Sequence, residues 1–176
     1  MERVVYKYIC NYIIEHSLLY MYSYQSGFLP GHSTVYQLLE IYHNICKNID
    51  NRLSSIIVFC DISKAFDRVW HKALLKKLQS YGITGDLLLW LDDYVSDRKQ
   101  KVVVNNECSN PNTVKAGVPQ GSVLGPLLFL FYINDITDNL GNLARLFADD
   151  TSLSYFGRNY DIMKSDINND LSKLNE

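Results

Sequence analysis

The chain has 176 residues, of which 47% are hydrophobic, and a formal net charge of −2 at pH 7. This length is enough for one domain, or one domain with an appendage, to bury a sizeable core. The longest uncharged apolar stretch, residues 123–133, is shorter than the roughly 20 residues that cross a bilayer, so no membrane partner is expected. The four cysteines have no metal-ligand spacing and predict reduced, packed thiols of an intracellular protein. The sequence does not decide between the nucleus and the cytoplasm.

Apolar residues at helical spacing predict two helices in the first third of the chain, near residues 5–16 and 35–46. Thr34 and Gln37 are expected to form the capping box of the second helix. Glycine and proline place residues 25–31 in a loop. The apolar run 55–60 then predicts a buried strand that ends at Asp61.

Two more helices, over residues 71–80 and 86–95, are expected next. Residues 101–104 and 113–115 read as strands paired around a turn at 110–112. A loop punctuated by glycine and proline then leads into an apolar helix over residues 127–136.

Two apolar stretches, residues 143–146 and 152–156, flank Phe147-Ala148-Asp149-Asp150 and predict a β-hairpin with the acids at its tip. An amphipathic helix begins near Ile162. This order of helices and strands belongs to the α+β class, and we expect a sheet backed by helices.

Three carboxylates therefore stand at strand ends. Asp149 and Asp150 are adjacent and repel each other unless a cation or solvent screens them, and Asp61 ends another strand. Two divalent ions about 4 Å apart activate an attacking hydroxyl and stabilise the leaving oxygen of a phosphoryl displacement. Asp61 and Asp149 suit such a site if their strands pair, although either acid alone fits a structural or surface role equally well. Asp67 is a rival for Asp61, but its place at a helix start favours a solvated carboxylate.

Positive charge is concentrated in two stretches of the chain. Each stretch is either a solvated face or a contact with nucleic acid, and composition does not decide between the two. The first contains Lys64, Arg68, His71, Lys72, Lys76 and Lys77, and the second contains Arg98, Lys99 and Lys101.

Three segments, Phe59–His71, Ala116–Phe129 and Phe147–Asp150, occur in an order and at spacings that resemble successive motifs of reverse transcriptases. The resemblance is to the enzymes of retrotransposons that lack long terminal repeats, and it covers nearly the whole chain. It implies a polymerase-type palm with an antiparallel sheet backed by helices and a partial helical fingers segment. It further implies that residues 1–50 are partial fingers and the fingers-to-palm segment, residues 51–160 the palm with the catalytic acids, and residues 161–176 the start of the remaining palm. Relative to this family the chain is truncated at both ends, so we expect fingers and thumb segments to be missing. We also expect these segments to be required for polymerisation.

The resemblance implies an RNA-directed DNA polymerase, which transfers a nucleotide from a deoxynucleoside triphosphate to a primer 3′-hydroxyl on an RNA template. It also implies two Mg²⁺ ions, with Mn²⁺ as a substitute. The implied catalytic acids are Asp61, Asp149 and Asp150, which with the Ile62 carbonyl would hold the metal ions. The implied nucleotide-binding residues are Ile62, Phe66, Gln120 and Gly121.

Phe66 matches the position where the family places an aromatic ring beneath the nucleotide sugar, so the expected product is DNA. The alternative is an ordinary core aromatic. Phe147 replaces a more usual tyrosine, and Leu29 and His32 stand where arginines are usual, which removes two phosphate-directed charges.

The sequence leaves two other functions open. One is a catalytically inactive retrotransposon remnant or a repurposed nucleic-acid-binding domain. The other is a nucleotide cyclase on a similar palm, which fits less well because it gives the loop of Gln120 no task.

Overall fold

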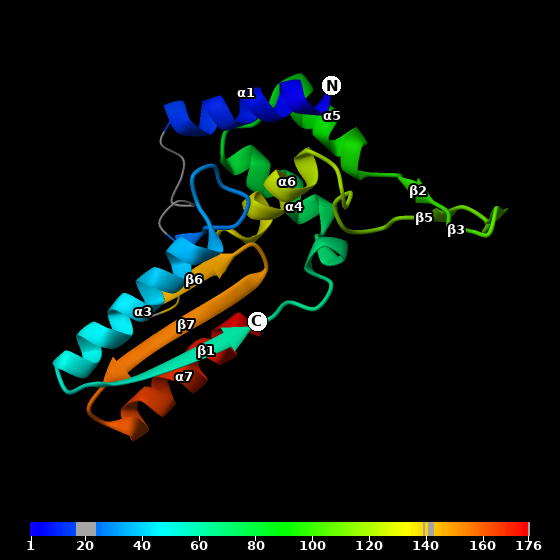
Figure 1. Ribbon diagram of the computed structural model, residues 1–176. Helices are drawn as coiled ribbons and strands as arrows, with labels where there is room; N and C mark the ends of the chain where they lie inside the picture. Colours follow the sequence, from blue (N-terminus) through cyan, green and yellow to red (C-terminus); the bar gives the residue numbers. More distant parts are fainter. Residues whose placement is uncertain (17–23, 139, 141–142, 176) are drawn as a thin grey trace. The chain divides into compact units, whose positions relative to one another are not determined.

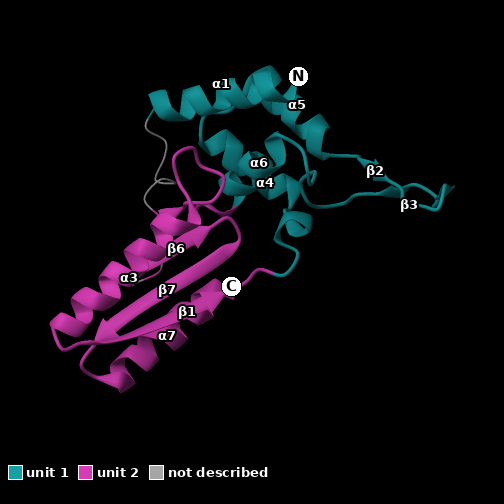
Figure 2. Ribbon diagram, in the orientation of Figure 1, with its two compact units in different colours: residues 1–18, 63–132 teal, residues 19–62, 133–176 magenta. Residues whose placement is uncertain are grey.

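The computed structural model describes residues 1–16, 24–138, 140 and 143–175. The chain divides into two compact units: a first unit of residues 1–18 and 63–132, and a second unit of residues 19–62 and 133–176 (Figure 2). Each unit thus combines two segments that are distant in the sequence. Among the described residues, no helix is both long and apolar enough to span a membrane. The expected functional division at residues 50 and 160 stays a prediction, because compactness does not report which segments act as fingers or palm.

The second unit contains a three-stranded antiparallel sheet with the strand order β1-β7-β6 (Figure 1). Its strands are β1 (Ser54–Cys60), β6 (Leu143–Phe147) and β7 (Asp150–Gly157). Helix α3 (Thr34–Asp50) contacts β1, and helix α7 (Tyr160–Leu174) packs against β7. The predicted α+β class, with an antiparallel sheet backed by helices, is confirmed.

The core of the second unit lies between the sheet and α7. Ala144, Leu153 and Tyr155 are buried there, and Ile56 and Val58 of β1 pack against them. The Tyr155 hydroxyl donates to the buried Asp170 carboxylate at 3.3 Å. Burial, and then the charge of Asp170, raises the pKa of Tyr155 above its ordinary value, so the hydroxyl keeps the proton that it donates.

Strand β1 differs from the prediction of a buried strand. Within the described residues it pairs only with β7, so it lies at an edge of the sheet, and Phe59 is 72% exposed. An apolar run of this length is typical of a buried strand, but periodicity does not report how many neighbours a strand has.

The first unit is mainly helical: α1 (Glu2–Glu15), the 3₁₀-helix η1 (Ala65–Arg68), α4 (His71–Ser80), α5 (Gly85–Val95) and α6 (Leu124–Ile133). Helix α6 is apolar on all sides and almost entirely buried. It begins three residues earlier than predicted, because Pro126 is tolerated in a first helical turn, where its missing N–H has no intrahelical partner.

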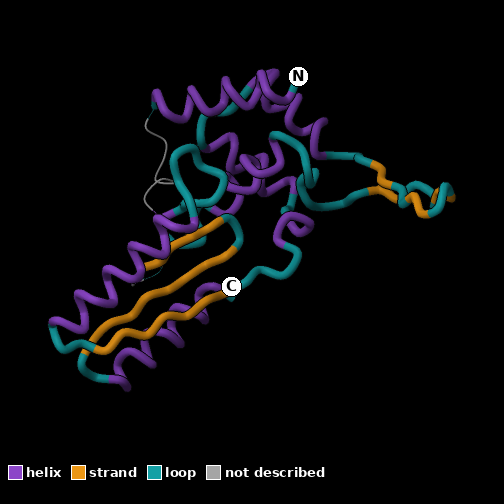
Figure 3. Tube along the Cα trace, in the orientation of Figure 1, coloured by secondary structure: helices purple, strands orange, loops and turns teal. Residues whose placement is uncertain are grey.

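Between α5 and α6 the chain forms an exposed β-ribbon (Figure 3). Strand β2 (Lys99–Gln100) pairs with β5 (Asn112–Thr113), and β3 (Val103–Val104) pairs with β4 (Glu107–Cys108). The predicted turn at residues 110–112 is wrong. The chain reverses instead at Asn105–Asn106, with φ angles of 49° and 65°. A two-residue hairpin turn needs positive φ at both central positions, and asparagine tolerates that conformation well.

The four cysteines form no disulfide, but they are less packed than expected. Three are half-buried, and Cys108 is exposed on the β-ribbon. Both residues of β4, Glu107 and Cys108, are exposed.

Glu2 satisfies backbone donors at the start of α6. Its Oε2 accepts hydrogen bonds from the backbone N–H groups of Val123 at 2.7 Å and Leu124 at 3.4 Å. A carboxylate at this position also interacts favourably with the helix dipole. We expect Glu2→Gln to lower the free energy of unfolding by about 1 kcal/mol in urea denaturation. Glu15→Gln, on an exposed residue at the end of α1, is the matched control, and equal stability of the two variants would contradict the capping role.

Candidate functional site

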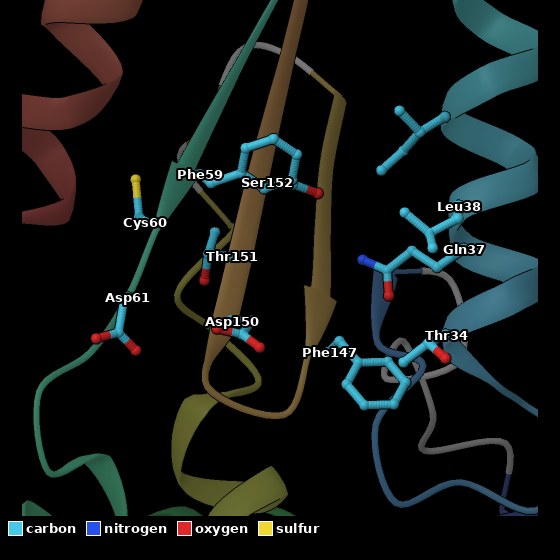
Figure 4. A pocket seen from close by; sticks show the side chains of 11 residues that line it. Thr34, Gln37, Leu38, Phe59, Cys60, Asp61, Phe147, Asp150, Thr151 and Ser152 are labelled. Carbon is cyan, nitrogen blue, oxygen red and sulfur yellow. The ribbon is translucent and has the colours of Figure 1, made fainter.

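Asp61 and Asp150 lie at the same end of two paired strands. Strands β1 and β7 are antiparallel with Cys60 opposite Thr151, so continuing the register by one residue sets Asp61 opposite Asp150. Both acids are exposed, and both line one cavity of about 350 Å³ in the second unit (Figure 4). A metal site shared by Asp61 and Asp149 requires the strand before Asp61 to pair with the hairpin that carries Asp149. This pairing is present.

The cavity beside these acids also has polar atoms with unused hydrogen-bonding capacity. In the part of the chain that the structure describes, Gln37 Oε1 and Thr151 Oγ1 are buried and have no hydrogen-bond partner, and both residues line the cavity (Figure 4). Buried polar atoms are normally satisfied, so these two mark a place for a polar ligand or water. Neither was identified from the sequence, because the helix pattern gave Gln37 a capping role. The cap is Ser33, whose Oγ accepts from the Tyr36 N–H at 3.4 Å.

Asp149 lies in the two-residue turn between β6 and β7, where it is half-buried. The preceding residue, Ala148, has a positive φ of 58°, which is uncommon for a residue with a side chain. Asp149 is not among the residues that line the cavity. Among residues 1–16, 24–138, 140 and 143–175, no three histidine, cysteine or acidic residues are arranged to hold a metal ion. The ligand set of Asp61, Ile62, Asp149 and Asp150 therefore stays a prediction.

The other predicted site residues lie in the first unit, where backbone hydrogen bonds join the loop before α6 to η1 and to Val69, the residue that follows it. The N–H of Gly117 donates to the Val69 carbonyl at 2.8 Å, and the N–H of Val118 donates to the Phe66 carbonyl at 2.9 Å. These bonds place the second of the three sequence motifs directly against the first.

A side-chain contact reinforces this junction and corrects the role expected for Asp67. Gln120 Nε2 donates to Asp67 Oδ1 at 3.0 Å. Asp67 is exposed, as expected, and the helix that it belongs to is the short 3₁₀-helix η1. It is not only a solvated carboxylate at a helix start, because it also accepts a hydrogen bond from the loop.

Gly117 is the most constrained position of the loop. Its φ is +92°, and a Cβ added there would lie 2.8 Å from both Asp67 Cα and the Phe66 carbonyl oxygen. Its carbonyl accepts hydrogen bonds from Arg98 Nη2 and from the ring Nε2 of His71, each at 2.8 Å. Members of both basic stretches thus have structural partners, so the stretches are not simply solvated faces.

A cavity of about 770 Å³ borders this loop. Three cations, Lys64, Arg98 and Lys115, line it together with Asp67 and Gln120. A polar cavity with an excess of positive charge attracts anionic ligands such as phosphate groups.

Phe66 and Gly121 are found in different surroundings. The Phe66 ring is half-buried and stacks on the Phe129 ring of α6, with centroids 4.4 Å apart. This contact is what a core aromatic makes, and the sugar-directed role of Phe66 stays a prediction. Gly121 is exposed with a φ of +77° and open space around its Cα.

Comparison with characterised sequences identifies close relatives of this chain. It is 38% identical over 146 residues to a protein named probable RNA-directed DNA polymerase from transposon BS, from Drosophila melanogaster, which covers 75% of this chain. It is also 37% identical to the probable RNA-directed DNA polymerase from transposon X-element and 33% identical to the RNA-directed DNA polymerase from mobile element jockey, both from the same species, covering 77% and 74% of this chain. The chain spans about 15% of the length of each of these relatives.

Solved structures show the same fold at low sequence identity. Apo telomerase from Candida tropicalis, truncated from its C-terminal domain, aligns with a TM-score of 0.68 at 12% identity, over 97% of this chain and 36% of that one. Telomerase from Candida albicans in complex with a fragment of telomeric RNA aligns with a TM-score of 0.63 at 13% identity, over 92% and 31%. The polymerase-type palm fold is therefore confirmed. Residues 2–173 match the family described as reverse transcriptase (RNA-dependent DNA polymerase), and the chain belongs to this family, on the branch of retrotransposons that lack long terminal repeats.

Proposed function

We propose that this chain is the palm, with part of the fingers, of an RNA-directed DNA polymerase. The observation that carries the proposal is the pairing of β1 with β7, which sets Asp61 opposite Asp150 with Asp149 in the adjacent turn. The proposed substrates are a deoxynucleoside triphosphate and the 3′-hydroxyl of a DNA primer on an RNA template. Fingers and thumb segments, which the family resemblance places outside residues 1–176, are proposed to be needed for full activity.

The donor atoms of the proposed site fit hard divalent cations. Carboxylate oxygens of Asp61, Asp149 and Asp150, with the Ile62 carbonyl, would hold two Mg²⁺ ions, and Mn²⁺ prefers the same oxygen donors. When bound, such a pair of ions lowers the barrier to attack by the hydroxyl and stabilises the leaving oxygen. The chain itself contributes a paired sheet that keeps Asp61, just after β1, and Asp150, at the start of β7, at one end.

In the first unit, the loop before α6 is proposed to bind the template base and the incoming nucleotide. One N–H of Gln120 is used by Asp67, and among the described residues its carbonyl oxygen and second N–H are available for a base or sugar. Gly121 has no side chain and permits close approach of a ligand to the backbone. Lys64, Arg98 and Lys115 of the neighbouring cavity would favour the negative charge of phosphate groups.

Primer extension tests this function directly. The purified chain is incubated with an RNA template annealed to a DNA primer, the deoxynucleoside triphosphates and either Mg²⁺ or Mn²⁺, and a reaction without template is the control. We expect template-dependent lengthening of the primer. A folded chain that extends no primer with either metal would favour the inactive remnant or binding domain, and a cyclic product formed from a triphosphate alone would indicate a cyclase.

Phe66 is proposed to exclude the 2′-hydroxyl of ribonucleotides. We expect Phe66→Ala to raise the incorporation of ribonucleotides relative to deoxyribonucleotides by about tenfold or more, since removing the ring opens space beneath the sugar. Single-nucleotide extension with each nucleotide class measures this ratio. Phe156→Ala, on an exposed phenylalanine of β7, is the matched control. A Phe66→Ala chain that loses stability but keeps its preference would show that the ring serves only as a packing partner of Phe129.

A further inference from the structure

The segment Gln25–Gly27 is docked on the turn that carries Asp149, although 123 residues separate Gln25 from that turn. Gln25 forms a parallel bridge with Leu146 at the end of β6, and the Ser26 N–H donates to the Leu146 carbonyl at 2.8 Å. Gln25 is only 3% exposed. A polar side chain this deeply buried needs partners for its amide, and it finds them in the turn.

The Gln25 amide binds both backbone groups of Ala148. Its Oε1 accepts from the Ala148 N–H at 2.8 Å, and its Nε2 donates to the Ala148 carbonyl at 3.3 Å. Ala148 lies in the turn, outside the β6–β7 ladder, whose last pair is Phe147 with Asp150. Its backbone groups therefore lack a strand partner, and the single Gln25 side chain supplies one for each.

Gly27 allows this side chain to come so close. A Cβ at position 27 would lie 2.2 Å from the Ala148 nitrogen, nearer than any real contact. The Gly27 N–H also donates to Gln25 Oε1 at 2.7 Å and so fixes the orientation of the amide. The segment is thus shaped to hold the turn from outside the sheet.

The turn needs such support because Ala148 has a φ of 58°. A residue with a side chain in this region costs of order 1–3 kcal/mol and persists only where its surroundings hold it there. The conformation of Ala148 sets the direction in which the next residue, Asp149, leaves the turn. The two hydrogen bonds from the Gln25 amide to the N–H and the carbonyl of Ala148 therefore control the direction of the Asp149 carboxylate.

We propose that Gln25 is a positioning residue for the carboxylates of Asp149 and Asp150. It acts through the Ala148 backbone and touches neither the substrate nor the metal ions. The expected effect of Gln25 on catalysis rests on the proposed polymerase function. The effect of Gln25 on cation binding can be measured without any reaction. Residues that orient metal ligands typically change metal affinity or activity by about 10- to 100-fold when they are replaced.

The test compares the wild-type chain with Gln25→Leu and Gln25→Glu. Leucine removes every hydrogen bond of the amide, whereas ionised glutamate keeps acceptors for the two N–H groups, loses the donor to the Ala148 carbonyl and adds one negative charge. We expect Mn²⁺ affinity, measured by isothermal titration calorimetry, to fall by about 10- to 100-fold in Gln25→Leu and by less in Gln25→Glu. In primer extension, kcat should fall in the same order while KM for the triphosphate changes little.

Tyr155→Phe is the matched control for stability. It removes a buried hydrogen bond from the same strand β7, to Asp170, without touching the turn. We expect it to lower Tm while Mn²⁺ affinity and kcat stay at the wild-type level. If Gln25→Leu fails to fold, the comparison of Gln25→Glu with Tyr155→Phe carries the test.

The outcomes separate this inference from the function on which it rests. Gln25 variants that lose stability but keep wild-type Mn²⁺ affinity and kcat would overturn the positioning role, and so would a wild-type chain that binds no Mn²⁺. A wild-type chain that binds Mn²⁺ but extends no primer would reject the polymerase proposal, and the binding measurements on the Gln25 variants would still decide the role of this residue.

Discussion

Replacing Asp149 by asparagine is expected to reduce the kcat of primer extension by about 1,000-fold or more. Asparagine has nearly the same shape as aspartate but lacks its charge, so the change removes a proposed metal ligand without altering the turn. Metal ions contribute several kcal/mol of transition-state stabilisation, and about 4 kcal/mol corresponds to this factor. Single-turnover extension at saturating triphosphate, with Mg²⁺ and with Mn²⁺, measures the loss.

The stability of the same variant distinguishes a catalytic acid from a structural one. Asp149 in the turn and Asp150 at the start of β7 are adjacent carboxylates, so removing one charge relieves repulsion in the metal-free chain. We therefore expect Asp149→Asn to have a Tm equal to or slightly above that of the wild type. Asp138→Asn, on an exposed acid of the same unit, should change neither activity nor Tm. Retention of wild-type activity by Asp149→Asn would reject the metal-binding role of this residue.

Local sequence patterns were sufficient to predict most elements of this fold. The β6–β7 hairpin, helices α4 and α5, and the strand before Asp61 all depend on the alternation or helical spacing of nearby residues, and all occur close to their expected positions. The β-ribbon was predicted with the wrong turn, because several asparagines in succession offer more than one place for the chain to reverse. Asn105–Asn106 is favoured because both residues adopt positive φ.

Contacts between distant segments were not accessible from the sequence. The pairing of β1 with β7 joins residues that are 91 to 103 positions apart, and no periodicity specifies which strands become neighbours. The amide of Gln25 reaches Ala148 across 123 positions, and a glutamine in a polar loop gives no local signal of burial. The candidate acids were identified because they stand at the ends of predictable strands, whereas the residues that hold them in place were not.

The largest stability effect is expected at Gly117, where the two motifs of the first unit meet. A methyl group there would lie 2.8 Å from the backbone of Phe66 and Asp67, and the φ of +92° is itself strained for alanine. Steric overlap with the backbone and the strained φ together predict that Gly117→Ala lowers the free energy of unfolding by about 3 kcal/mol. For a chain of this size, that loss corresponds to a fall in Tm of about 6–12 °C in thermal denaturation.

Gly85→Ala separates these two contributions. Gly85 also has a positive φ, of 65°, but an added Cβ meets no atom within 4 Å, so this variant reports the backbone strain alone, about 1 kcal/mol. An equal loss in both variants would mean that the close approach of the loop to η1 is absent in solution. A larger loss at Gly117 would show that the backbone of the Gln120 loop lies directly against η1 in solution. A glycine is then required at position 117, because the backbone of Phe66 and Asp67 occupies the space that a side chain at position 117 would need.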